Sequence, residues 1–326
     1  MTEADNWLKS SIPGLQIDQP GLLTTLQDWG RLGQLAQGIT RGGPIDERAF
    51  LWSNKLLSNK PTAAQLEITL GDLTVTALSD GFWVVCGAPV VVTKNHQPQA
   101  TWQVFPVAKG DTVTIAAPPR GLRSYLAVAG GIRAKQVLGS VATVMRDGLG
   151  GLQGDGQPLK RGDTLNVGEF APQQVIAHRR PKHAFIPRIS ATSTLELGVI
   201  PVAQYGQFSE TEIAKFFEQT FEVTAKQDRM GVRLHTGQPL NWSHGEIISE
   251  PLPIGAIQVP PDGQPIIMLN DCQTLGGYPK IGVLRWSARM ALAQATAGTQ
   301  IRFVRTELSE AQEEVKQAFR FFNLNV

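Results

Sequence analysis

The sequence predicts a mainly β protein with a few helices. Short apolar runs bounded by glycine and proline recur along the whole chain, which is typical of strands joined by tight turns. A turn that leads into a strand also occurs three times, at residues 110–113, 162–165 and 298–301. Because the third copy lies in the second half of the chain, the pattern favours two related β-rich domains.

In chain order, the first predicted element is a helix after Gly43. Pro44 suits the first helical position, and Asp46 and Glu47 complement the positive end of the helix dipole. The helix is expected to end near Ser58. Its apolar face consists of Ile45, Ala49, Trp52 and Leu56. The strands predicted after it are residues 73–78, 82–86, 90–93, 112–116 and 124–128.

The domain boundary is predicted between residues 177 and 187. This segment is basic and contains proline, as linkers between domains often do. The predicted domains are therefore residues 15–178 and residues 187–326.

The second half contains two predicted helices and one short strand. Residues 209–212 read Ser-Glu-Thr-Glu, a capping box that predicts a helix start. Residues 260–263 form a predicted turn before an apolar strand at 266–269. A C-terminal helix is predicted to open at 309–312. The phenylalanines of both helices are interpreted as core residues.

Composition narrows the class of protein. The chain has 326 residues, enough for two cores, with 42% hydrophobic residues, 18% charged residues and a net charge of +2. These values give no reason to expect a nucleic acid or a membrane surface as partner. The apolar runs are too short to span a bilayer, and the N-terminus lacks the pattern of a secretory signal. Two cysteines predict no disulfide framework, so a cytoplasmic location is expected.

Several common chemistries lack their sequence motif. We find no phosphate-binding loop, no Gly-x-Ser-x-Gly elbow and no Met-Lys-Met biotinylation motif, and the glycine-rich segment 148–154 is interpreted as a turn. The five histidines do not fall at metal-ligand spacing, so no metal site is predicted. Cys272 is either a nucleophile or a small buried apolar residue, and a lone thiol favours the latter.

Two loops, at residues 25–33 and 259–280, combine ionisable and amide side chains with glycine. Glycine lets a backbone approach a ligand closely, so both are candidate site loops, although a hairpin with a polar rim has the same pattern. Arg31 either pairs with Asp28 or offers its planar fork to a carboxylate. The neighbours Asp228 and Arg229 leave the same alternatives open. Glu67, between apolar residues, faces either solvent or a pocket.

Seven motifs occur in the order found in one family. They are Gln27-Asp28-x-Gly30-Arg31-x-Gly33, the Gly-x-x-Asp helix start at 43–46, and residues 125–131, 138–140, 228–234, 255–260 and 273–280. The chain resembles, from about residue 20 to 303, the biotin-dependent carboxyltransferase or allophanate hydrolase subunit 2 family. It departs from the family at residues 141–143, where Val-Ala-Thr replaces Arg-Ser-Thr, and at 202–204, where Val-Ala-Gln replaces Gly-Pro-Gln. These departures leave the role of the missing arginine and serine, and the exact substrate, open.

The resemblance implies two cyclophilin-like β-barrel domains in tandem. It also implies that the chain is the C subunit of an ATP-dependent 5-oxoprolinase, which opens 5-oxo-L-proline to L-glutamate with separate A and B subunits, the KipI-like B subunit being the most direct partner. ATP and Mg²⁺ would act at the level of the complex, and no cofactor is assigned to this chain. The alternatives are a carboxyltransferase subunit of a biotin-dependent urea carboxylase or allophanate hydrolase system, and a KipA-like regulatory binding protein. The ligand is expected to be small and either carboxylated or urea-like.

From the loops and motifs together we predict a set of site residues and no metal ligand. The predicted catalytic residues are Asp28, Arg31 and Asp271. The predicted substrate-binding residues are Gln27, Asp46, Asn54, Arg229, Gln258, Gln273, Thr274, Tyr278 and Lys280.

Overall fold

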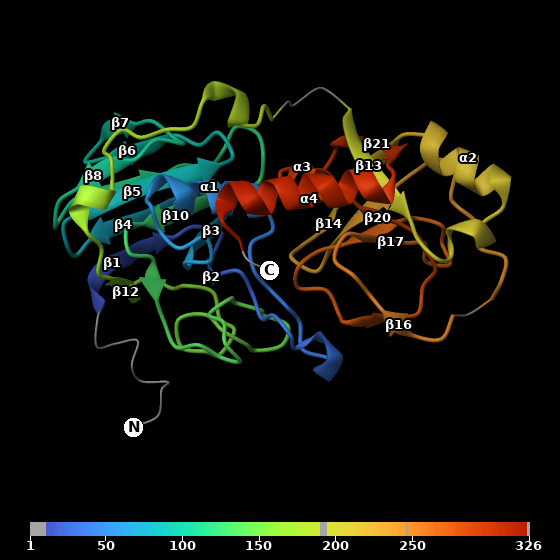
Figure 1. Ribbon diagram of the computed structural model, residues 1–326, viewed down its shortest axis with the longest axis horizontal. Coiled ribbons are helices and arrows are strands. Elements are labelled where there is room, and N and C mark those ends of the chain that lie inside the picture. The colour runs from blue at the N-terminus through green and yellow to red at the C-terminus, as the bar shows by residue number, and fades with distance from the viewer. Residues whose placement is uncertain (1–10, 190–193, 246, 325–326) are drawn as a thin grey trace. The chain divides into compact units, whose positions relative to one another are not determined.

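The computed structural model describes residues 11–189, 194–245 and 247–324 (Figure 1). It is mainly β, as predicted. The chain divides into two compact units, one containing residues 11–32 and 42–189 and the other residues 33–41 and the described residues after 193. Residues 33–41 belong to the second unit by their contacts, although they fall inside the predicted 15–178 domain.

The first unit contains two antiparallel sheets. The seven-stranded sheet has the order β11 (Ile132–Arg133), β12 (Thr164–Gly168), β1 (Ser11–Pro20), β4 (Leu73–Ala77), β9 (Thr112–Ile115), β6 (Val92–Lys94) and β7 (Gln97–Gln99). The five-stranded sheet has the order β2 (Leu23–Gln27), β3 (Gln65–Thr69), β10 (Arg123–Val128), β5 (Gly81–Gly87) and β8 (Phe105–Val107).

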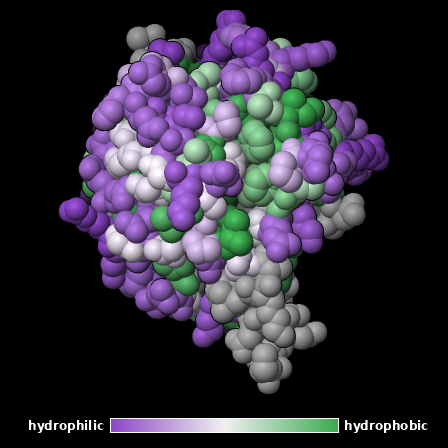
Figure 2. Space-filling model, turned by 90° about the vertical axis from the view of Figure 1, so that its left-hand side faces the viewer, coloured by the Kyte–Doolittle hydropathy of each residue, from purple (hydrophilic) through white to green (hydrophobic). Residues whose placement is uncertain are grey.

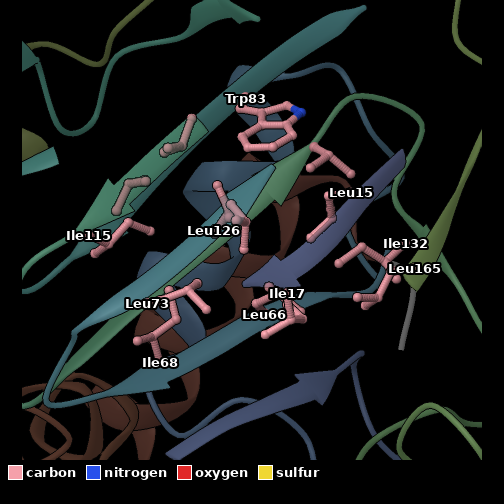
Figure 3. Packing of buried hydrophobic residues seen from close by; sticks show 14 of the residues in the cluster. Leu15, Ile17, Leu66, Ile68, Leu73, Trp83, Ile115, Leu126, Ile132 and Leu165 are labelled. Atoms are coloured by element: carbon pink, nitrogen blue, oxygen red, sulfur yellow. The ribbon is translucent and has the colours of Figure 1, made fainter. Parts of the chain in front are cut away.

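The core of the first unit lies between its two sheets. Leu15 and Ile17 of β1 pack in one cluster with Leu66 and Ile68 of β3 and with Leu126 of β10 (Figure 3). Helix α1 (Glu47–Leu56) contacts β5 and β10, and every residue of β10 is buried. The five-stranded sheet is therefore covered on both faces, which explains why β10 is buried throughout instead of alternating between buried and exposed residues.

The three turns that share a sequence pattern share one hydrogen-bonding scheme. In the first copy, the Asp111 carboxylate accepts from the backbone N–H of Ala108 at 2.8 Å, and its backbone C=O accepts from that of Ala77 at 2.8 Å. Asp163 makes the equivalent bonds with Lys160 and Ile17, and Thr299 with Thr296 and Val223. Each turn thereby fixes the start of its strand against a neighbour, twice in the first unit and once in the second.

The second unit is a closed barrel of seven strands. Its order is β13 (Leu195–Pro201), β20 (Lys280–Leu284), β17 (Ala256–Gln258), β18 (Ile266–Met268), β15 (Gly231–His235), β14 (Phe221–Gln227) and β21 (Gln300–Arg305). Strands β13 and β21 pair in parallel and close the ring. A separate two-stranded sheet joins β16 (Glu250–Pro251) to β19 (Leu275–Gly276). The expected barrel is thus seen in closed form in this unit, whereas the strands of the first unit lie in two sheets.

The remaining elements of the described chain are three helices and several single turns. Helices α2 (Glu210–Glu218), α3 (Trp286–Leu292) and α4 (Leu308–Phe322) belong to the second unit. Single 3-10 turns lie at Leu35–Gln37, Pro172–Gln174, His183–Phe185 and Tyr205–Gln207. The ring of Phe216 from α2 stacks on Phe303 from β21 with centroids 4.5 Å apart, which confirms Phe216 as a core residue, whereas Phe217 is only partly buried.

Helix starts were predicted with mixed success. Ser209 caps α2 by accepting from the Glu212 N–H at 3.3 Å, as the capping box indicated. Helix α1 begins at Glu47, so the prediction that Pro44 occupies its first position is wrong. Asp46 is the cap instead, and its carboxylate accepts from the Ala49 N–H at 3.1 Å. Helix α3 was not predicted, because its short sequence carries no capping signal.

The polarity of the surface agrees with the composition of the sequence. The face shown in Figure 2 is mostly hydrophilic, with hydrophobic residues showing through in patches. No helix in the described ranges is long and apolar enough to cross a membrane.

Candidate functional site

The predicted site residues fall in both units. Residues Gln27, Asp28, Arg31, Asp46 and Asn54 belong to the first unit, and the others belong to the second.

Asp28 holds together two loops of the first unit. Its Oδ1 accepts hydrogen bonds from the Ser140 hydroxyl at 2.5 Å and from the Gly30 N–H at 2.9 Å, and its Oδ2 accepts from the Val141 N–H at 2.9 Å. A carboxylate with three donors is fixed in place. Ser140, which the sequence reasoning did not select, is therefore the partner that gives the Leu-Gly-Ser motif its role here.

Arg31 is buried within the first unit, with 1% of its surface exposed. Its Nε donates to the Val137 carbonyl at 3.2 Å, and its guanidinium lies close to the backbone at Gly42 and Gly150. A side chain at Gly150 would collide with that guanidinium. The expectation that Arg31 presents its fork to an incoming carboxylate is thus not supported by its position, because the loop around it is packed.

The other predicted residues of the first unit make hydrogen bonds that support the fold. Gln27 donates from Nε2 to the Thr143 carbonyl at 3.1 Å. Asn54 donates from Nδ2 to the carbonyls of Pro61 and Ala63, at 3.1 and 2.8 Å. Asp46 caps α1 as described. These side chains shape the ends of β2 and α1.

Glu67 faces neither solvent nor a pocket, the two alternatives left open by the sequence. It is buried, and its Oε2 accepts from the Tyr125 hydroxyl at 2.6 Å and from the Ile45 N–H at 2.9 Å. The Tyr125 oxygen in turn accepts from the Asp46 N–H at 2.8 Å. Burial, with the nearby charges of Glu67 and Asp46, raises the pKa of Tyr125 well above its ordinary value, so the phenol stays protonated and keeps donating. The network anchors the start of α1 to β3 and β10.

A cavity of about 670 Å³ opens in the first unit beside the Asp28 loop. Its volume lies in the range of small-molecule sites. Small or apolar side chains, Ala63, Ala64, Ile132 and Ala134, form part of its lining. The charged residues that line it are Asp28, Lys60, Arg133 and Glu169, of which only Asp28 was predicted.

In the second unit, Arg229 and Asp271 bind each other. The Arg229 Nε lies 2.8 Å from Asp271 Oδ2, and its Nη2 lies 2.9 Å from Asp271 Oδ1. Both side chains are buried, with 3% of each exposed. Asp228 instead accepts from the N–H groups of Met230 and Gly231 and shapes the turn. The two neighbouring charges therefore point to different partners, and Arg229 fastens the 228–231 turn to the loop after β18.

Lys280 belongs to a polar cluster at the start of β20. Its ammonium is paired with the Glu250 carboxylate, which also accepts from the Gln204 side-chain amide. Gln204 accepts in turn from the backbone N–H of Lys280 at 3.3 Å. Lys280 is buried, whereas 37% of the Glu250 side chain is exposed. The bond from Lys280, and then that from Gln204, holds the pKa of Glu250 below its ordinary value.

The glycine pair 276–277 brings backbone and amide groups together beside this cluster. Gln258 donates from Nε2 to the Tyr278 carbonyl at 3.4 Å, and a side chain at Gly276 would collide with the Gln258 amide. Tyr278 is 45% exposed, and Gln273 and Thr274 are partly buried. In the second unit, the Tyr278 phenol and the Glu250 carboxylate are therefore exposed to solvent. The Lys280 ammonium lies directly behind the Glu250 carboxylate.

Neither cysteine adds a nucleophile to the cavity of the first unit or to the polar cluster of the second unit. Both cysteines are buried, and burial, followed by the charge of Asp46, raises the pKa of Cys86 well above its ordinary value. Among the described residues, no group of three or more His, Cys, Asp or Glu side chains could hold a metal ion. The Lys, Arg, Tyr and backbone groups described above can supply hydrogen bonding and charge stabilisation.

A family model described as carboxyltransferase domain, subdomain A and B, matches residues 37–305. That range covers most of the chain. The chain belongs to this carboxyltransferase-domain family.

Members of the family resemble this chain over most of its length. The C subunit of 5-oxoprolinase from Escherichia coli is 36% identical over 309 residues, which are 94% of this chain and 96% of that protein. The protein of the same name from Haemophilus influenzae is 32% identical and covers 88% of this chain and 89% of its own length. The crystal structure of the K. lactis urea amidolyase superposes with a TM-score of 0.88 at 26% identity, over 96% of this chain and 20% of that one.

Sequence reasoning missed several polar residues of this carboxyltransferase-domain chain. Ser140 ends the motif at 138–140, and Gln204 ends the departing segment 202–204. Each is a family residue that is kept beside a departure, and this signal pointed to them. Glu250 gave no signal, because it approaches Lys280 only through the pairing of β16 with β19. Lys60 and Arg133 lie outside the two glycine-rich loops that directed the search.

Proposed function

We propose that this chain acts as the C subunit of a 5-oxoprolinase complex, which opens 5-oxo-L-proline to L-glutamate at the expense of ATP. The observation that carries the proposal is the similarity to the C subunit of the E. coli enzyme, which is 36% identical over 94% of this chain and 96% of that protein.

The chemistry of the reaction agrees with the groups present. An unstrained lactam is a poor electrophile, so its carbonyl must be activated and the charge that develops on the carbonyl oxygen must be stabilised. Donors that are held in place before the reaction serve this purpose best. Lys280, fixed by Glu250, is such a donor, and Tyr278 offers an exposed phenol two residues away; we place substrate contact there.

ATP and Mg²⁺ belong in this proposal to the complex and not to this chain. Its sequence contains no phosphate-binding loop. The A and B subunits are the proposed partners, with the B subunit in direct contact. A cytoplasmic location stays a prediction.

A second candidate is a carboxyltransferase acting on urea with biotin-dependent partners. The TM-score of 0.88 to the K. lactis urea amidolyase favours it. However, this chain spans only 20% of that chain, so the resemblance concerns one segment of a larger enzyme.

The test is a comparison of substrates in the assembled complex. The chain is co-purified with A- and B-type subunits encoded in the same genome, and ADP release is measured with 5-oxoproline or with urea and bicarbonate. We expect turnover with 5-oxoproline only. Turnover with urea that requires a biotin carboxylase would favour the second candidate.

Substitutions test the proposed contacts. Tyr278→Phe and Lys280→Met are expected to lower turnover by about tenfold or more, since each removes a donor worth about 1.5 kcal/mol. Lys226→Met, an exposed lysine of the same unit, is the matched control. Full activity in both site variants would place substrate contact elsewhere.

A further inference from the structure

The first-unit cavity has two cations whose charged groups have no partner among the described residues. Lys60 and Arg133 both line it and both are exposed. Within the described part of the chain, neither side chain makes a hydrogen bond or an ion pair. Arg229 and Lys280, by contrast, are each paired with a carboxylate. Lys60 and Arg133 are therefore available to a ligand.

Gly168 supports the position of Arg133. Its φ lies outside the left-handed region, so the backbone there does not require glycine. A Cβ at this position would lie 2.6 Å from Arg133 Nη2 and 2.7 Å from its Nε, and also 2.6 Å from the Gly130 carbonyl oxygen. The missing side chain leaves the space in which the guanidinium lies against the end of β12. Arg133 is thereby held at the cavity wall.

The charges of the lining decide which anion fits. Lys60 and Arg133 bring two positive charges, and Asp28 and Glu169 bring two negative ones. A phosphate dianion would be repelled by the Asp28 and Glu169 carboxylates, which costs binding free energy. A ligand with a single carboxylate carries one negative charge, and the Arg133 guanidinium balances that charge by itself. The planar guanidinium also matches a carboxylate through two parallel hydrogen bonds.

The rest of the lining suits a small apolar body. Ala63, Ala64, Ala134 and Ile132 leave room where larger side chains would fill the space. We infer that this cavity binds a small organic carboxylate, with Arg133 and Lys60 on the carboxylate and the alanine-lined wall against its carbon skeleton. The inference does not require that the protein be a 5-oxoprolinase subunit.

A matched pair of ligands tests it on the isolated full-length chain. 5-Oxoproline and 2-pyrrolidinone share one ring and differ by the carboxylate. In calorimetric titrations at low salt we expect saturable binding of 5-oxoproline, and binding of 2-pyrrolidinone and of phosphate that is at least about tenfold weaker. Equal binding of 5-oxoproline and 2-pyrrolidinone, or no binding of either, would overturn the inference. Phosphate binding as tight as that of 5-oxoproline would overturn the assignment to carboxylates.

Variants locate the site. Arg133→Ala is expected to weaken 5-oxoproline binding about tenfold or more, and Lys60→Ala by less, because a charge-assisted fork is lost only in the first. Arg120→Ala removes an exposed arginine elsewhere in the first unit and should leave binding unchanged. Gly168→Ala should weaken binding with Arg133 still present, and Arg133→Lys reports the loss of the fork alone. Undiminished binding in both Arg133 variants would refute the site.

Because this assay needs no other subunit and no ATP, its failure is separate from a failure of the proposed function. An inactive complex whose isolated chain binds carboxylates through Arg133 would leave the inference standing.

Discussion

Arg229 and Asp271 form a two-point ion pair inside the second unit, although they lie in different loops. Their two nitrogen-to-oxygen distances are 2.8 and 2.9 Å, and the Asp271 N–H also donates to the Arg229 carbonyl at 2.9 Å. Asp271 was predicted to be catalytic and Arg229 to bind substrate. Their mutual binding gives both residues a structural role in the fold of the barrel, and it changes what their substitution should do.

Asp271→Asn is expected to destabilise the protein by about 3–5 kcal/mol, because it leaves the Arg229 charge buried without its partner. Denaturant unfolding followed by circular dichroism measures the change. The double variant Arg229→Met with Asp271→Leu should lose less than the single one. Arg233→Met, which breaks the exposed pair with Asp262, is the control and should cost at most about 1 kcal/mol. A single variant as stable as the parent protein would show that the pair does not hold the loops.

Ser140→Ala is expected to cost about 1–3 kcal/mol, since the Asp28 carboxylate loses a charge-assisted donor in a buried loop. Thermal melting measures this loss. The control is Ser79→Ala, whose half-buried hydroxyl makes no hydrogen bond to any described residue. Equal melting temperatures for the two variants would show that Ser140 does not support the cavity wall.

Glu250 should make stability depend on pH in the acid range. Its pKa is held below the ordinary value of 4.5 in the folded protein, first by Lys280. A depressed folded pKa contributes stability that is present above the unfolded value and is lost as the pH falls through the folded value. Glu250→Gln should therefore be less stable than the parent protein at pH 7. The difference should shrink as the pH falls below 4.5.

Unfolding at several pH values measures this dependence. A stability difference that stays constant between pH 7 and pH 3 would show that the carboxylate charge does not act through Lys280. Because 37% of the Glu250 side chain is exposed, added salt should reduce the difference at pH 7.

Local signals predicted much of the fold. The side-chain bonds within the turns before β9, β12 and β21 and at the Ser209 cap join residues three positions apart, so the local sequence predicts them, whereas the backbone bonds of these turns to Ala77, Ile17 and Val223 are tertiary. The start of α1 was misplaced because Asp46 competes with Pro44 as a start signal. Tertiary bonds from Ile45 to Glu67 and from Asp46 to Tyr125 settle that competition.

The site was harder to predict, because its contacts are distant in sequence. Asp28 was selected correctly as a polar loop residue, but its partner Ser140 is 112 positions away. Arg31 was considered as a partner of Asp28 or of a ligand carboxylate, and it is buried because the loops that pack around it come from near Gly42 and Gly150. Patterns of residue type find such side chains, but they do not show what lies opposite them.

The measurement that tests the central claim most directly is an omission experiment with the reconstituted complex. Glutamate formed from 5-oxoproline and ATP is measured with this chain alone, with the A- and B-type subunits alone, and with all three. We predict glutamate only in the complete mixture, together with co-elution of this chain and the B-type subunit in size-exclusion chromatography. Glutamate formation that is equally fast without this chain would contradict its assignment as the C subunit.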